Sequence, residues 1–256
     1  MKIASFNTNS LRARLPIIKN WLHEEQPDIL ALQETKVQDK DFPFNDFIEM
    51  GYLAIIRGQK SYNGVALIAR REPVNIRKDL YEEGDEQARF ISADFSGITI
   101  INVYVPQGFA PGTDKFEYKL KWLNDLLVYI QRTYSPEDQV LILGDFNVAM
   151  DERDVYDPEG LKGSAGFHPD EQEILSRFFK WGFVDIFRKH NQAADQYTFW
   201  DYRIPNALKR NKGWRIDYIA ATQPLAEKSR SIVVDIKPRT LEKPSDHTFI
   251  VAEFDL

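Results

Sequence analysis

The abundance of short strand-like segments constrains the fold of this chain more than any other feature. About eleven apolar or β-branched runs have the length of strands, whereas only about three segments have the spacing of substantial helices. The predicted strands are Lys2–Asn7, Asp28–Glu34, Tyr52–Arg57, Val65–Arg70, Arg89–Phe95, Ile98–Val105, Val140–Asn147, Tyr197–Arg203, Arg215–Ala221, Ile232–Lys237 and Phe249–Leu256. The predicted helices are Leu11–Glu25, Asp114–Tyr134 and Pro169–Trp181, and Pro16 is expected only in a first helical turn.

Many of these strands follow one another without a helix between them. Asn63-Gly64 and Ser96-Gly97 each separate two strand-like runs and indicate β-hairpins. A doubly wound parallel sheet would need a crossover helix for nearly every strand pair. The sequence therefore predicts an α/β protein with two mixed sheets packed face to face and helices outside them.

Composition limits the kind of protein this is. A chain of 256 residues with 43% hydrophobic and 28% charged residues, and without a Gly, Pro or Ser-rich linker, indicates one compact domain over residues 1–256. No cysteine is present, which excludes disulfides, thiolate metal ligands and cysteine nucleophiles. The four histidines are scattered, so any metal site should be built mainly from oxygens, which favours Mg²⁺ or Mn²⁺. Since neither a signal peptide nor a membrane-spanning run is recognisable, we expect a cytoplasmic protein without a membrane partner.

Charge is distributed unevenly along the chain. The net charge of −6 argues weakly against a nucleic-acid partner. However, residues 203–215 contain only basic charged residues and residues 79–86 only acidic ones. Such segregation permits a basic face on an acidic protein, although solvated charged loops explain it equally well.

Polar residues with catalytic potential recur near the ends of the predicted strands. In Val140–Asn147 an apolar run ends in Gly144, Asp145, Phe146 and Asn147, so Asp145 and Asn147 should share a side while Phe146 points into the core. The other groups of this kind are Asn7, Glu34, Tyr104, Asp217, Asp246 and His247. Converging carboxylates repel one another unless a cation lies among them. We therefore expect these side chains to surround a divalent metal.

Each of these residues also has a structural interpretation. Asn7 is equally suited to capping the following helix, and Glu34 to pairing with Lys36. Tyr104 lies in a β-rich segment, where tyrosine is more often a packing residue. Asp217 could form a salt bridge with Arg215, which lies on the same strand face. These interpretations must all hold together if no site exists.

At these residues the chain resembles the exonuclease III type of abasic-site (AP) endonucleases, within the endonuclease/exonuclease/phosphatase superfamily. The motifs, in family order, are SFNTNSLR at 5–12, LQETK at 32–36, GVAL at 64–67, NVYVPQG at 102–108, GDFN at 144–147, YTFWDYR at 197–203, GWRIDY at 213–218 and KPSDH at 243–247. The resemblance implies a four-layer α/β sandwich and Mg²⁺-dependent cleavage of double-stranded DNA 5′ to an abasic site, and we expect the protein to be a monomer. It also implies 3′ to 5′ exonuclease and 3′-end trimming activity.

The resemblance also assigns roles to single residues. Glu34 resembles the main metal ligand, with Asn7 and Asp246 as ligands or ligand-orienting groups. Asp145 is similar to the residue that activates water, Asn147 to its positioner, His247 to the imidazole that binds phosphate, Asp217 to the residue that orients this imidazole, and Tyr104 to a phenol that contacts phosphate. Phe199, Trp214 and Ile216 resemble the lining of a pocket for a baseless sugar, although core packing explains Phe199 equally well. Asn63, Lys209 and Lys212 are candidates for DNA contact.

Some features depart from the family or leave its chemistry open. Asn9-Ser10 stands where members commonly have a glycine second, and Leu161 and Ser164 replace DNA-contacting asparagines of some members. Incision beside uracil or other damaged bases is not decided by the sequence. Two other functions remain as alternatives: a superfamily phosphatase acting on a small or lipid phosphoester, and an inactive nucleic-acid-binding regulator.

Overall fold

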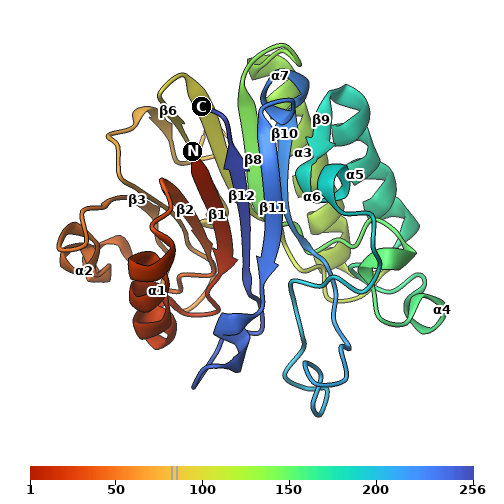
Figure 1. Cartoon of the computed structure of the whole chain (residues 1–256). Helices are drawn as coiled ribbons and strands as arrows, with labels where there is room; N and C mark the ends of the chain where they lie inside the picture. The colour runs from red at the N-terminus through yellow and green to blue at the C-terminus, as the bar shows by residue number, and fades with distance from the viewer. Residues whose placement is uncertain (82, 85) are drawn as a thin grey trace.

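The computed structural model describes residues 1–81, 83–84 and 86–256. Two of the acids in the predicted acidic segment, Glu82 and Asp85, lie outside the described residues. The described strands form two six-stranded sheets (Figure 1). The first sheet has the order β11-β12-β1-β2-β4-β3, and the second has the order β5-β6-β7-β8-β10-β9.

Each sheet mixes parallel and antiparallel pairs. In the first sheet only β1 and β2 run parallel, and in the second only β7 and β8 do. The strands of the first sheet are β1 (Lys2–Asn7), β2 (Ile29–Gln33), β3 (Leu53–Arg57), β4 (Val65–Ala69), β11 (Ser229–Asp235) and β12 (Phe249–Phe254). Those of the second are β5 (Val74–Arg77), β6 (Phe90–Phe95), β7 (Ile98–Tyr104), β8 (Val140–Asp145), β9 (Phe183–Asp185) and β10 (Asp217–Thr222).

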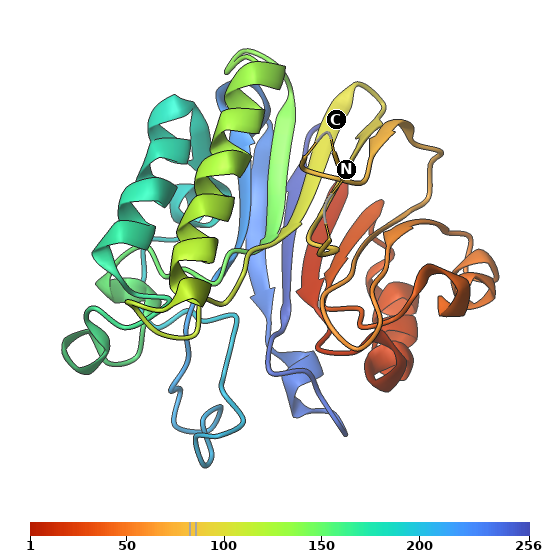
Figure 2. The same cartoon turned by 180° about the vertical axis from the view of Figure 1, so that it is seen from behind.

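Helices cover the outer faces of both sheets. The helices are α1 (Leu11–Glu25), α2 (Phe44–Ile48), α3 (Asp114–Thr133), α4 (Pro158–Leu161), α5 (Pro169–Trp181), α6 (Ile186–His190) and α7 (Gln223–Ala226), with 3₁₀ turns η1 (Asp39–Asp41), η2 (Glu152–Asp154) and η3 (Lys237–Thr240). In Figure 2, α3 and α5 lie side by side against one sheet, while α1 and α2 lie on the opposite flank. The expected four-layer α/β sandwich is confirmed.

Three buried clusters hold the layers together. Residues from the inner faces of both sheets form the first cluster, exemplified by Ile3, Leu67, Ile100 and Leu143. A second cluster joins the β5–β10 sheet to α3 and α5 through residues such as Trp122, and a third joins the other sheet to α1 and α2. Because removal of apolar surface from water drives this packing, the central strands of each sheet are buried on both faces.

Several predicted elements agree with the structure. Both hairpins are present, since β3 pairs antiparallel with β4 and β6 with β7. The strand Tyr197–Arg203 was predicted wrongly, because only Phe199 forms isolated bridges there, with Trp214 and His247. Beyond Trp200 the chain turns away and has no strand with which to pair.

Other boundaries also differ from the prediction. β5 and β9 are short and were missed, and β11 begins at Ser229 and ends at Asp235 because the chain then enters η3. Pro16 lies in the second turn of α1 rather than the first. The helix therefore lacks one backbone hydrogen bond, because proline has no N–H to donate.

Candidate active site

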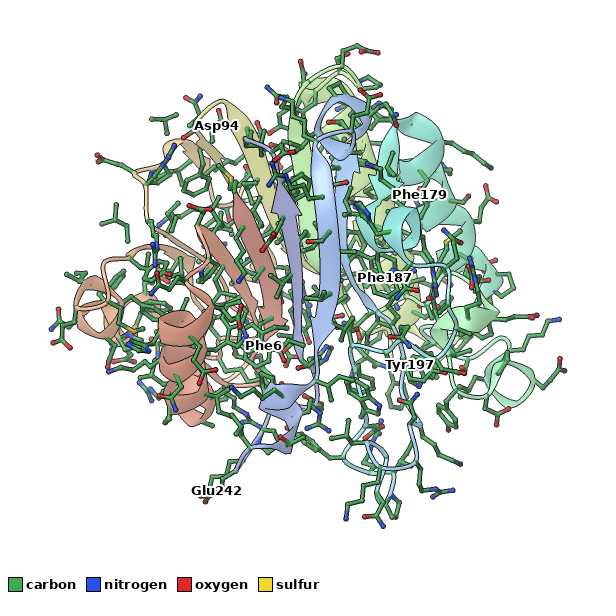
Figure 3. The ribbon with its side chains drawn as sticks, viewed as in Figure 1. Phe6, Asp94, Phe179, Phe187, Tyr197 and Glu242 are labelled. Carbon is green, nitrogen blue, oxygen red and sulfur yellow. The ribbon has the colours of Figure 1, made fainter. Side chains whose placement is uncertain are left out.

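The functional residues meet at one edge of the sandwich. β1, β2, β7 and β8 all end there, and β10 begins there, with Asp217 paired to Asp145 and Tyr104 also paired to Asp145 in register. In Figure 3, Phe6 and Tyr197 lie toward this edge and Asp94 at the opposite end. Both sheets therefore present the ends of their central strands to the same region.

Asn7 connects the two sheets at this edge. Its amide nitrogen donates to Glu34 Oε1 at 2.9 Å and to Asp145 Oδ2 at 2.8 Å. Asn147 completes the group, since its backbone N–H donates to Asp145 Oδ1 at 2.9 Å and its side-chain amide to Asp145 Oδ2 at 3.2 Å. The alternative that Asn7 caps the following helix is wrong, because the N-cap of α1 is Ser10 and it has no side-chain cap hydrogen bond.

His247 and Asp217 form the other side of the cluster. His247 Nδ1 lies 2.9 Å from Asp217 Oδ2, and His247 Nε2 lies 3.7 Å from Asp145 Oδ2. All three side chains are buried. Burial disfavours the imidazolium, but the carboxylates of Asp217 and Asp145 outweigh this effect and raise the pKa of His247 to about 10.

The two acids nearest Asn7 differ in their environment. Burial, together with the nearby carboxylates of Asp217 and Glu34, raises the pKa of Asp145 to about 7. Burial also acts on Glu34, but the ammonium of Lys36, 2.9 Å from Glu34 Oε2, outweighs it and lowers the pKa of Glu34. Tyr104 stays neutral, because burial and the neighbouring Glu34 raise the pKa of its phenol.

The cluster has the composition of a metal site. Ligand atoms from Glu34, Asp145 and His247 all lie within 4.8 Å of one another. Two of the three groups are carboxylates, and burial together with the charges of Asp217 and Glu34 raises the pKa of Asp145. A cation among these groups would relieve that repulsion, so the residues fit a metal ion.

Asp246 belongs to the same region without joining this cluster. It lines the cavity, and its Oδ1 accepts a hydrogen bond of 3.0 Å from Asn9 Nδ2. Asn9 Oδ1 in turn accepts from Lys36 Nζ at 2.5 Å. The sequence interpretation missed Asn9 as a member of this network, whereas it named Lys36 as a possible partner of Glu34, and that pair is present.

A cavity of ≈ 680 Å³ opens beside the cluster. Its lining includes Glu34, Tyr104, Asp145, Asn147, Asp246 and His247, and also Phe199, Trp214 and Ile216. The last three belong to an apolar cluster with Val155 and Phe167. The rings of Phe199 and His247 are 4.8 Å apart between centroids. Phe199 therefore both packs against its neighbours and faces the cavity, which unites the two interpretations left open by the sequence.

Three of the predicted substrate-binding residues do not line this cavity. Asn63 is buried, and its amide donates to Gln59 Oε1 at 2.9 Å. Lys209 is exposed, and Lys212 lies 5.2 Å from the ring centroid of Tyr156, which does line the cavity. The lysines lie on the long connection between Trp200 and Trp214 that projects from the site edge (Figure 1).

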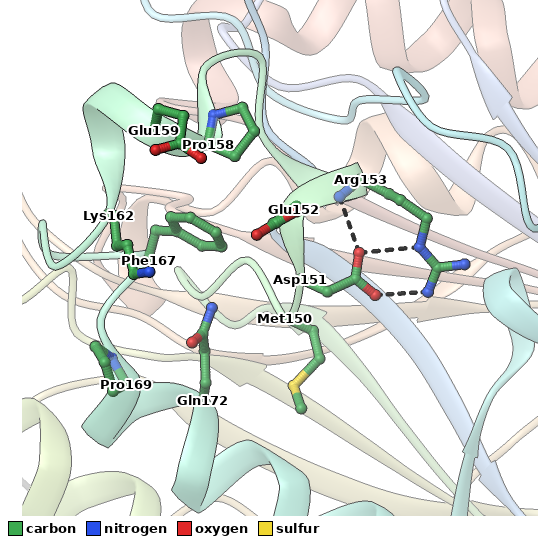
Figure 4. A pocket seen from close by; sticks show the side chains of 10 residues that line it. All are labelled: Met150, Asp151, Glu152, Arg153, Pro158, Glu159, Lys162, Phe167, Pro169 and Gln172. Carbon is green, nitrogen blue, oxygen red and sulfur yellow. Dashed lines mark hydrogen bonds and ion pairs between the residues drawn. The ribbon is translucent and has the colours of Figure 1, made fainter.

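A second cavity, of ≈ 470 Å³, lies beside α4 and the start of α5 (Figure 4). Its lining consists of Met150, Asp151, Glu152, Arg153, Pro158, Glu159, Lys162, Phe167, Pro169 and Gln172. Asp151 is held by Arg153, with Oδ2 2.6 Å from Nη2. Its lining is distinct from the predicted site residues, so we assign the chemistry to the larger cavity.

Fold and cluster together define a class of protein, the two-sheet hydrolases of phosphoester bonds. The profile of the Endonuclease/Exonuclease/phosphatase family matches residues 4–247, and the chain belongs to this family. It is 38% identical to exodeoxyribonuclease III of Haemophilus influenzae, over 99% of this chain and 100% of that protein.

Two solved structures are similar over their whole length. One is an AP endonuclease from Archaeoglobus fulgidus, with a TM-score of 0.96, 44% identity and 100% of both chains covered. The other is a 3′ phosphatase from Neisseria bound to product DNA hairpin, with a TM-score of 0.95, 36% identity and the same coverage. The resemblance to exonuclease III type enzymes is thus confirmed, and with it the expected class, a nuclease of DNA repair.

Within the described ranges, no helix combines the length and apolar character needed to cross a membrane.

Proposed function

We propose that this protein hydrolyses the DNA phosphodiester 5′ to an abasic site with the help of Mg²⁺, for which Mn²⁺ can substitute. The observation that carries this proposal is the position of Asn7, Glu34, Asp145 and His247 beside a cavity with an apolar wall. Double-stranded DNA with abasic or damaged sites is the proposed partner, bound by a monomer in the cytoplasm.

Asp145 is the proposed acceptor of the proton from the attacking water. With an ordinary aspartate this transfer would be uphill by about 16 kcal/mol, from pKa values near ~15.7 and ~3.9. Burial and the carboxylates of Asp217 and Glu34 raise the pKa of Asp145, which makes this transfer less unfavourable. Asn147 donates hydrogen bonds to both carboxylate oxygens of Asp145. It thereby holds the carboxylate in one orientation and is proposed to position the water.

His247 is the proposed donor to the phosphate. Asp217 fixes its Nδ1 and favours the imidazolium, so Nε2 is left to face the cavity and Asp145. Tyr104 faces the same cavity as a neutral phenol that can donate to a phosphate oxygen.

Glu34 would hold the metal ion as its main ligand, with Asn7 and Asp246 as further ligands or ligand-orienting groups. Oxygen ligands suit Mg²⁺ better than softer ions. When bound, the cation supplies stabilisation for the negative charge that gathers on the phosphate and the leaving 3′ oxygen.

Selection of the abasic site is assigned to Phe199, Trp214 and Ile216. A nucleotide without a base loses little pairing or stacking when it is turned out of the duplex. An apolar wall beside the reacting phosphate favours such a sugar and excludes one that carries a base. The basic residues Lys209 and Lys212, together with Asn63, are proposed to contact the DNA backbone outside the cavity.

Removal of a 3′ terminal phosphate is a second proposed activity. It needs the same hydrolytic groups, and the Neisseria relative with that named activity is similar over the full length of this chain. Exonuclease trimming of 3′ ends would use the site in the same way.

The experiment is incision of a duplex that contains one abasic analogue, with Mg²⁺ and then with EDTA. We expect a single cut 5′ to the analogue, loss of cutting in EDTA, and a loss of at least about 10³-fold in Asp145→Asn. Asp170→Asn is the matched control, because Asp170 is exposed at the start of α5.

Efficient release of phosphate from an inositol phosphate or a lipid, without incision of DNA, would favour the phosphatase alternative. Binding of nucleic acid without any hydrolysis would favour the inactive regulator.

A further inference from the structure

A buried ion pair lies directly behind the active site. Lys119 of α3 and Glu171 of α5 contact each other through ammonium and carboxylate, and both side chains are 0% exposed. Replacement of such a pair by apolar residues of similar size is often neutral or stabilising, since both charges lose their hydration on burial. Stability alone therefore does not account for this pair.

The remaining contacts of the lysine go to two active-site segments. Lys119 Nζ donates to the backbone oxygen of Asn147 at 2.7 Å and to that of Gln107 at 3.4 Å. An ammonium group has three N–H donors, and Glu171 with these two carbonyls matches that number. Both Asn147 and Gln107 line the cavity beside Asp145.

The glutamate holds a third segment in the same way. Glu171 Oε2 accepts hydrogen bonds from the backbone N–H of Gly166 at 2.8 Å and from that of His168 at 3.1 Å. Gly166 lines the cavity, and a Cβ added to it would lie 3.2 Å from the ring of Trp214. Glu171 therefore sets the position of the chain that backs the proposed sugar pocket.

Close packing around Gly108 supports this arrangement. Gly108 has a φ of +89°, and a Cβ at this position would lie 2.9 Å from Lys119 Cδ. The backbone after β7 thus rests directly on the stem of the lysine. A shorter residue at position 119 would remove this support, and a neutral one would remove the ammonium that binds the two carbonyls.

We propose that Lys119 and Glu171 are positioning residues of the nuclease, which hold the backbone at Gln107, Asn147 and Gly166 in the geometry that hydrolysis requires. The pair acts through Asn147, which orients Asp145, and through the wall behind Trp214. This inference rests on the proposed function of the same site. It adds that the charge pair serves catalysis beyond its contribution to folding.

The test is a comparison of Lys119→Met, Glu171→Leu and the double variant that carries both changes. Each single change leaves one buried charge without its partner and should lower the melting temperature. The double variant should regain most of that loss, because the remaining groups form an apolar contact. Its single-turnover rate should nevertheless stay about 10- to 100-fold below wild type, while DNA affinity changes by less than about threefold.

Hydrogen exchange supplies a readout that does not need activity. In the double variant we expect faster amide exchange in peptides covering residues 105–110, 145–149 and 164–168. Lys121→Met is the control, since Lys121 lies on the same helix in an exposed pair with Asp125. The control should change neither rate nor exchange.

A folded double variant with wild-type rate and wild-type exchange would overturn the proposal. If the double variant does not fold, Glu171→Gln takes its place, because it keeps an acceptor for Gly166 and His168 but removes the charge that binds Lys119. That variant should show the same loss of rate, and wild-type rate and exchange would again contradict the inference. A wild-type protein that leaves abasic DNA uncut would refute the proposed function, and the exchange measurement would still decide the role of the pair.

Discussion

The imidazole of His247 depends on a carboxylate contributed by the other sheet. Asp217→Asn removes that charge while keeping an oxygen within reach of His247 Nδ1. We expect the pKa of His247 in metal-free protein to fall from about 10 toward the ordinary 6.5. Nitrogen-15 NMR of the imidazole measures this directly. An unchanged pKa in the variant would contradict the assigned interaction.

The same change predicts a pH-dependent loss of stability. Because the folded state raises the pKa of His247, its stabilising effect is complete below about 6.5 and disappears as pH rises through about 10. Asp217→Asn should therefore be less stable than wild type by about 1.5–3 kcal/mol at pH 6, and this difference should shrink toward pH 10. Urea unfolding in EDTA at both pH values tests the sign, and a difference that grows with pH would contradict it.

Individual residues were predictable from the sequence where they stand at the end of an apolar run. Glu34 and Asp145 come at the end of such a run and Asp217 at the start of one, and polar side chains at strand ends gather at a sheet edge. The pairing of Lys36 with Glu34 was also predictable, since the two residues are close in the sequence. The role of Asn9 was not, since its contact with Asp246 comes from tertiary structure alone. The roles given to these residues remain predictions until variants are measured.

At the scale of elements, β8 depends on a glycine beside its parallel neighbour. Gly144 has a φ of +134°, and a Cβ there would lie 2.0 Å from the backbone oxygen of Val103 in β7. We expect Gly144→Ala to lower the free energy of unfolding by about 2–5 kcal/mol, through backbone strain and overpacking together.

Gly97→Ala is a matched control for this change. Gly97 also has a positive φ, +84°, but a Cβ there has no neighbour within 4 Å. It should cost only about 1 kcal/mol, from backbone strain alone. Equal losses in the two variants, measured by urea unfolding, would show that the contact with Val103 is unimportant.

The connection between Trp200 and Trp214 predicts the salt dependence of DNA binding. Alanine at Lys209, Arg210 and Lys212 removes exposed or half-exposed positive charges near the site edge. If each contacts a phosphate, the slope of log affinity against log salt should flatten by up to about 2.7, at about 0.9 per contact.

Fluorescence anisotropy at several salt concentrations measures this slope. A control variant with alanine at Lys180, Lys228 and Arg230 removes the same charge from exposed positions at the opposite end of the sheets. Its slope should match wild type. Equal flattening in both variants would mean that overall charge, rather than this connection, sets the salt dependence.

Elements with regular patterns were predicted well, and those that depend on distant partners were not. The hairpins at Ser96-Gly97 and Asn63-Gly64 have local turn signals that fix their pairing. The aromatic segment Tyr197–Arg203 has the composition of a strand, but its one bridging residue, Phe199, serves the cavity instead. β5 and β9 are short edge strands whose pairing is set by the neighbouring strand rather than by their own sequence.

For the whole molecule, the cluster between the sheets predicts cooperative unfolding. Residues of both sheets share this cluster, so neither sheet can bury its inner face alone. We expect a single transition, with the same midpoint by circular dichroism and tryptophan fluorescence, as one domain over residues 1–256 requires. Separate transitions for the two probes would contradict the single-domain prediction.

The overall architecture followed from strand count and family motifs. The resemblance also named three residues of the cavity, Phe199, Trp214 and Ile216, but the full lining of the cavity could not be derived from either. Its walls come from segments as distant as Glu34, Gly166 and His247, and only the packed sheets bring these together. The net charge was also a poor guide to the binding partner. A protein with a net charge of −6 still has a basic segment, between Trp200 and Trp214, at the edge of its site.

The central claim is that both sheets supply one site in which water attacks a phosphorus atom. Incision of abasic duplex in water enriched with oxygen-18, followed by mass spectrometry of both products, tests it most directly. The account predicts one oxygen-18 atom in the 5′ phosphate and none in the 3′ hydroxyl. A 5′ phosphate without oxygen-18, or a 3′ hydroxyl that carries it, would contradict the account.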